Sequence, residues 1–70
     1  MVKYRVSQSE IDELNKERVL SIIRYYTFKE GGIDLEKVNP TTLVHRYGIS
    51  LEDAKKAVKT LISEGKVVKV

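Results

Sequence analysis

The C-terminal half of the chain most constrains the fold, because it carries start and stop signals for two successive helices. Asn39-Pro40 is a typical helix start, since asparagine caps the free amides and proline at the first helical position loses no hydrogen bond. Gly48 ends this helix, Ser50 begins the next one, and Gly65 ends it. We therefore predict helices over residues 40–47 and 51–64, followed by a strand over residues 66–70.

A long helix is predicted in the N-terminal half. Ser7 and Glu10 have the spacing of a capping box, in which two side chains satisfy free amides at the helix start. The stretch from Val19 to Tyr26 is apolar on nearly every side, so we expect this helix to lie between other elements. Gly31 is positioned to end it. We predict a helix over residues 8–30, a small strand at residues 33–35, and a strand or ordered arm over residues 1–6.

This order predicts a mainly α fold with a small β component: helix, strand, helix, helix and strand, preceded by the N-terminal strand or arm. Seventy residues make a single domain with a small core. In the last helix, apolar residues recur from Ala54 to Ile62 at helical spacing. The predicted core consists of Leu20, Ile23, Tyr26, Leu43, Val44, Ile49, Ala54, Ala57, Val58, Leu61, Ile62 and Val68.

Composition argues against several classes of function. The chain has no cysteine, and no ligands are spaced for a metal around His45, its one histidine. There is no glycine-rich phosphate loop, no apolar run of the roughly 18 residues that span a membrane, and no signal peptide. We therefore expect a cytoplasmic protein that is not an enzyme and has no cofactor, metal, membrane or small-molecule substrate. Scarce glutamine and asparagine are typical of a thermophile.

Charge is unevenly distributed along the chain. Residues 1–38 carry seven basic and seven acidic side chains, whereas residues 39–70 carry six basic and three acidic ones. The whole net charge of +3 therefore lies in the C-terminal half and favours an anionic partner. Tyr25, Tyr26 and Tyr47 lie in apolar patterns, so we expect them to pack in the core rather than stack on bases.

The segment from Asn39 to Val58, NPTTLVHRYGISLEDAKKAV, resembles the winged helix-turn-helix superfamily, especially its small archaeal members. The resemblance covers roughly residues 17–70 and implies that residues 51–64 form a recognition helix. It implies a protein of transcription or chromatin that places this helix in the major groove of double-stranded DNA. The residues implied in nucleic-acid contact are Thr41, Thr42, His45, Arg46, Ser50, Lys55, Lys56, Lys59 and Thr60.

Other interpretations stay open. Glu52 and Asp53 would repel the DNA backbone, and Glu52 could pair with Lys56 on a merely solvated face. The wing is truncated, and some archaeal winged helices with a broken wing bind a partner peptide by strand addition. Such a partner would pair with Lys66, Val67, Val68, Lys69 and Val70. A homodimer through the long helix, or ribosomal RNA contact as in a similar small-subunit ribosomal protein, are further alternatives.

Overall fold

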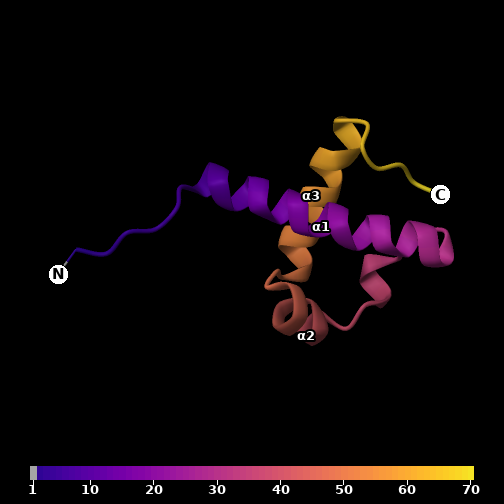
Figure 1. Ribbon diagram of the computed structural model, residues 1–70, viewed down its shortest axis with the longest axis horizontal. Helices are drawn as coiled ribbons and strands as arrows, with labels where there is room; N and C mark the ends of the chain where they lie inside the picture. The colour runs from indigo at the N-terminus through magenta and orange to yellow at the C-terminus, as the bar shows by residue number, and fades with distance from the viewer. Residues whose placement is uncertain (1) are drawn as a thin grey trace.

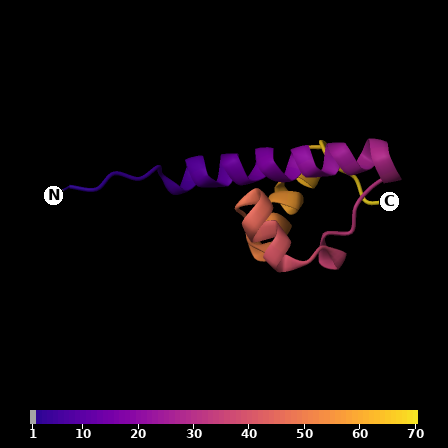
Figure 2. The same cartoon turned by 60° about the horizontal axis from the view of Figure 1, so that its bottom comes forward.

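The fold is a long helix with the C-terminal half of the chain folded against one side of it. Residues 2–70 are described by a computed structural model, which measures 49 × 27 × 18 Å (Figure 1). Figure 2 shows the shorter helices together beneath the long one. The elements are α1 (Gln8–Glu30), the 3-10 turn η1 (Leu35–Lys37), α2 (Pro40–Thr42), its π-helical continuation η2 (Leu43–Tyr47), and α3 (Leu51–Ser63).

Helix α1 begins and ends where the local signals predict. The Ser7 hydroxyl accepts a hydrogen bond from the Glu10 amide at 3.3 Å, which caps the N-terminus. At the other end Gly31 has a φ of +80°, and its amide donates to the Thr27 carbonyl at 3.1 Å. This left-handed turn closes the helix in the manner typical of glycine. The prediction of a helix over residues 8–30 is confirmed.

The helix-turn-helix segment is also built from local caps. Asn39 Oδ1 accepts from the Thr41 amide at 2.9 Å, and Ser50 Oγ accepts from the Asp53 amide at 3.2 Å. Between them Gly48, with a φ of +68°, ends the first helix. The predicted helix over residues 40–47 is present, but its second part has the wider π-helical turn. The predicted helix over residues 51–64 ends at Ser63, and Glu64 is its C-terminal cap.

The predicted β component is wrong, because the structure contains no strand anywhere in residues 2–70. Residues 2–6 form an extended arm, residues 33–34 lead into η1, which begins at Leu35, and residues 66–70 form an extended tail. Figure 1 shows the arm beyond the start of α1 and the tail beside its second half. The tail follows Glu64, which is bonded to Lys16, and ends near Gly32, just beyond α1. The arm points away from the tail, and no backbone hydrogen bond joins the two segments within residues 2–70. Met1 lies outside the described residues.

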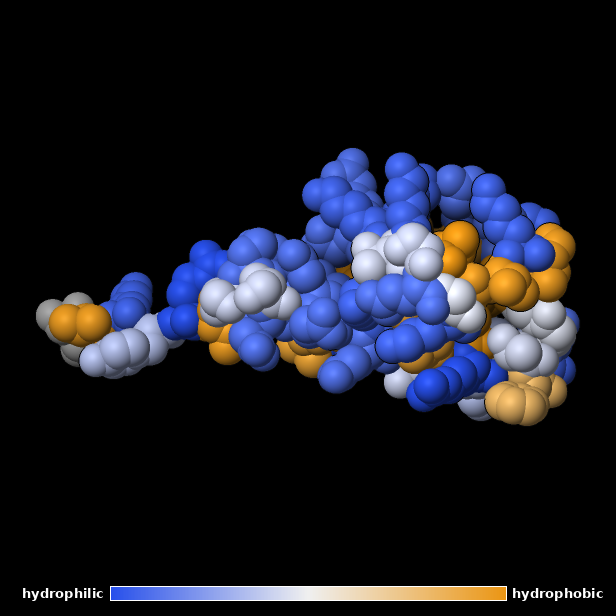
Figure 3. All heavy atoms as spheres, turned by 90° about the horizontal axis from the view of Figure 1, so that it is seen from above, coloured by the Kyte–Doolittle hydropathy of each residue, from blue (hydrophilic) through white to orange (hydrophobic). Residues whose placement is uncertain are grey.

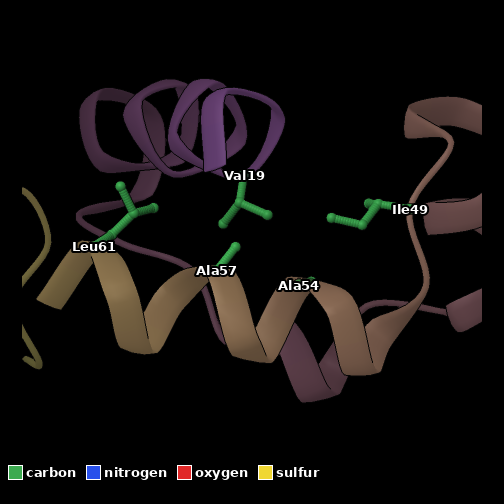
Figure 4. Close-up of a cluster of buried hydrophobic side chains, with 5 residues drawn as sticks. All are labelled: Val19, Ile49, Ala54, Ala57 and Leu61. Carbon is green, nitrogen blue, oxygen red and sulfur yellow. The ribbon is translucent and has the colours of Figure 1, made fainter. Parts of the chain in front are cut away.

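The core lies where α1 crosses α3. Figure 4 shows Val19 of α1 above Ala57 of α3, with Leu61 and Ile49 on either side. Small alanine side chains let the two helices approach closely, and Val19 is fully buried as a result. The buried residues are Val19, Ile22, Leu43, Ile49, Ala54, Ala57 and Leu61.

The predicted core is corrected at five positions. Val19 and Ile22 are buried although the prediction omitted them, because α1 is apolar on several sides and only packing selects the inner one. Val44, Ile62 and Val68 are 51%, 36% and 73% exposed. Val44 lies on the outer side of its helix, Ile62 lines a groove beside the tail, and Val68 lies in a tail that no strand covers. Leu20, Ile23, Tyr26 and Val58 are partly buried.

Candidate nucleic-acid interface

The outer face of α3 presents the basic residues implied in DNA contact. Ala54, Ala57 and Leu61 face the core, so the residues between them face solvent. Lys55, Lys56, Lys59 and Thr60 are all exposed. Two of the implied hydroxyls are already engaged locally: Ser50 caps α3, and Thr60 Oγ1 donates to the Lys56 carbonyl at 3.3 Å. The lysines are therefore the main free groups of this face.

Lys55 lies at one edge of the face and has an acidic partner. Its Nζ is 2.9 Å from Glu36 Oε1 on η1, and this hydrogen bond raises the pKa of Lys55. Both side chains are about half exposed or more, so the pair contributes little to stability. The pair nevertheless places a negative charge beside Lys55. Sequence analysis missed Glu36, because the contact depends on how η1 packs against α3.

Lys56 lies at the opposite edge, beside the first half of α1. It shares a shallow hollow of about 370 Å³ with Asp12, Glu13 and Asp53. Lys16 lines the same hollow and pairs with Glu13, so Asp12 and Asp53 are the carboxylates that weaken the positive potential at that edge. Lys59 is four residues from Lys55 and three from Lys56, so it lies between the two edges.

Within residues 2–70, neither Lys56 nor Lys59 takes part in an ion pair, so the alternative Glu52–Lys56 pair does not form.

The first helix of the motif contributes a second group of exposed side chains. Thr41, Thr42, His45 and Arg46 line one shallow hollow of about 260 Å³. The Thr41 amide is already bonded to Asn39, so its hydroxyl is the group left for a ligand. The structure brings these four residues onto one surface, as the helix over residues 40–47 predicts.

The turn between the two helices is tied to α1. Arg18 Nη1 donates a hydrogen bond to the Gly48 carbonyl at 3.2 Å. This contact joins residues 30 positions apart, so no local pattern could reveal it. Arg18 therefore helps to set where α2 and α3 sit relative to α1.

The C-terminal tail forms a different candidate surface. Residues 66–70 line a groove of about 720 Å³ together with Ile23, Val58 and Ile62. Val67 packs against the core, whereas Val68 and Val70 are exposed. Figure 3 shows apolar surface gathered at the end of the molecule that holds the C-terminus, while hydrophilic side chains cover most of the remaining face.

Within residues 2–70, no three acidic, histidine or cysteine side chains are grouped so that they could hold a metal ion. None of the helices in this part of the chain is both long and apolar enough to span a membrane. Comparisons with protein-family models, with curated proteins and with solved structures found no match. Function is therefore inferred from this chain's own residues and geometry.

Proposed function

We propose that this chain is a non-enzymatic DNA-binding protein that places α3 in the major groove of a duplex. The observation that carries the proposal is the pair of capped helices joined by residues 48–50, with Lys55, Lys56 and Lys59 on the outer face of α3. In a helix-turn-helix the second helix meets base edges and the first crosses the backbone. Lysine can donate to guanine acceptors or to phosphates.

The exposed residues of the first helix support the same orientation. Hydroxyls such as those of Thr41 and Thr42 donate to phosphate oxygens, and Arg46 can hold a phosphate through two parallel hydrogen bonds. Both groups of side chains belong to one motif, whose turn is held by Arg18. The motif therefore offers a backbone-contacting helix and a base-contacting helix in consecutive positions.

The acidic neighbours limit the expected affinity. Glu36 is paired with Lys55, and Asp12, Glu13 and Asp53 lie beside Lys56. A single small module makes few phosphate contacts, so its binding is weak and falls steeply as salt rises. A homodimer on DNA would double the number of contacts.

Charge reversal at Lys59 tests the proposal most cleanly, because Lys59 has no ion pair within residues 2–70. We expect Lys59→Glu to weaken binding to a random duplex at least about tenfold at constant salt and to lower the salt dependence. The measurement is fluorescence anisotropy across a salt series, with circular dichroism to check the fold.

Arg24→Glu is the matched control, since it reverses one exposed charge on α1 away from the motif. It should weaken binding much less. If Lys59→Glu binds the duplex as tightly as the unchanged protein does, or if both variants lose the same amount of affinity, α3 is not the contact surface.

A second candidate function is protein–protein interaction by strand addition at residues 66–70. Within residues 2–70, no backbone hydrogen bond joins residues 67–70 to another segment, so their peptide groups are free to pair. A segment that could pair with them is the arm, in which exposed Val2, Tyr4 and Val6 alternate with basic residues. Since the arm points away from its own tail, the occupant would be the arm of a second copy.

A further inference from the structure

A second hollow lies where the latter half of α1 meets η2, apart from the outer face of α3. It has a volume of about 660 Å³, which is within the range of small-molecule sites. Three of its side chains are cationic and three are aromatic, and no acidic side chain lines it. These six residues are Arg18, Lys29, Arg46, Tyr25, Tyr26 and Tyr47.

The charge of this hollow suits an anion. Within residues 2–70, none of the three cations takes part in an ion pair. Arg18 is held in place by its hydrogen bond to the Gly48 carbonyl, while Lys29 and Arg46 are exposed. Three unneutralised positive charges around a concave surface raise the local concentration of anions. The guanidinium of Arg46 can hold a phosphate through two parallel hydrogen bonds.

The aromatic side chains suit a planar ring. The rings of Tyr25 and Tyr26 are perpendicular, with centroids 5.1 Å apart, and Lys29 Nζ lies 5.4 Å from the Tyr25 centroid. Tyr25 is 58% exposed, so the prediction that it packs in the core is wrong. Its exposed ring is available to stack on a base, and stacking tolerates any base because each has a π face.

We propose that this hollow binds one nucleotide unit, with the base against the tyrosines and the phosphate against Arg46 and Lys29. A bare phosphate would leave the tyrosines unused, and an uncharged ring would leave the cations unused. A base can lie against the tyrosines only when it is not stacked on neighbouring bases. The ligand is therefore a free nucleotide or a nucleotide of an unpaired strand. This site lies apart from the outer face of α3, but it shares Arg46 with the first helix of the motif proposed to contact DNA phosphates.

The first test compares adenosine monophosphate with its two halves. We expect it to bind at least about tenfold more tightly than adenosine or inorganic phosphate, since stacking and charge act together. Tyrosine ring signals in nuclear magnetic resonance report the binding, and Tyr4 in the distant arm is an internal reference. Equal affinity for phosphate alone, or shifts that are absent from Tyr25, Tyr26 and Tyr47, would overturn the proposal.

Variants test the two parts of the site separately. Tyr25→Leu and Arg46→Gln should each weaken nucleotide binding roughly tenfold. Arg24→Gln is the matched control, because it removes one positive charge from α1 outside the hollow. Lys59→Glu should also leave nucleotide binding unchanged, which separates this site from the duplex-binding face. Equal losses in Arg24→Gln and Arg46→Gln, or full binding by Tyr25→Leu with an intact fold, would contradict the assignment.

A short single-stranded oligodeoxyadenylate distinguishes the two sources. Tighter binding than adenosine monophosphate, lost in the same two variants, would assign the site to an unpaired strand. Equal affinity would assign it to a free nucleotide. The proposal would be overturned if adenosine monophosphate did not bind and if both variants bound the oligonucleotide as tightly as the unchanged protein does.

Discussion

Gly48 combines a backbone requirement with a tertiary contact. Its φ of +68° lies in the left-handed region, where a side chain is strained, and its carbonyl accepts the hydrogen bond from Arg18. A Cβ built at this position would be 3.2 Å from Arg18 Nη1. A larger residue would therefore strain the turn and displace the guanidinium that holds it.

We expect Gly48→Ala to lower the free energy of unfolding by about 1–2 kcal/mol, with a further loss if Arg18 is displaced. Urea denaturation measures the change. Gly31→Ala is the matched control, because Gly31 also has a positive φ but a Cβ there would meet nothing within 4 Å. If Gly31→Ala loses less unfolding free energy than Gly48→Ala, the difference measures the contribution of Arg18. If Gly48→Ala leaves the unfolding free energy unchanged, the turn tolerates a side chain.

The C-terminal tail, residues 66–70, is an extended segment that is not paired with another strand in the described part of the chain. Apolar and polar side chains alternate less regularly in residues 66–70 than in a half-buried strand. Val67 is the residue of this tail that packs against the core. A strand needs a partner for its backbone groups, and within residues 2–70 no segment pairs with residues 67–70. The segment predicted to be the wing strand is therefore an unpaired extended tail, and its residues line an apolar groove.

If a second copy's arm pairs with this edge, the protein should dimerise as its concentration rises, and sedimentation velocity measures this. Val68→Pro should shift the population to monomer, because proline removes a backbone donor. Val68→Ala keeps that donor and should dimerise. Since Val68 is 73% exposed, neither change disturbs the core. A monomer at every concentration, or a dimer that Val68→Pro does not weaken, would exclude pairing at this edge.

For the whole molecule, one ion pair links the long helix to the end of α3. Lys16 Nζ is 2.8 Å from Glu64 Oε2 and 3.1 Å from Glu13 Oε1. The hydrogen bond from Lys16 lowers the pKa of Glu64, and the bond to Glu64 followed by that to Glu13 raises the pKa of Lys16. Because the folded state favours both charged forms, the molecule's stability depends on pH at both extremes.

The direction of this dependence follows from the sign of each shift. Glu64 stabilises the folded state above the ordinary glutamate pKa of about 4.3, and that stability is lost as the pH falls through its lowered pKa. The contribution of Lys16 is present below its ordinary pKa and is lost as the pH rises through its raised pKa.

Glu64→Gln should therefore flatten the acid side of a plot of unfolding free energy against pH. Glu52→Gln, at an exposed residue without an ion pair in residues 2–70, should leave that side unchanged. Equal acid slopes for Glu64→Gln and the unchanged protein would contradict this account.

Local sequence patterns predicted where the helices begin and end, because caps act over a few residues: Ser7 with Glu10, Asn39 with Thr41, and Ser50 with Asp53. They also placed the candidate lysines on the outer face of α3, through the spacing of the apolar residues.

The packing of the helices selected which side of α1 is buried and which cations are neutralised, and it left the extended segments without a strand partner in residues 2–70. The contacts of Arg18 with Gly48 and of Lys16 with Glu64 join residues 30 and 48 positions apart. Such contacts depend on how the helices cross, and a local pattern carries no information about that crossing.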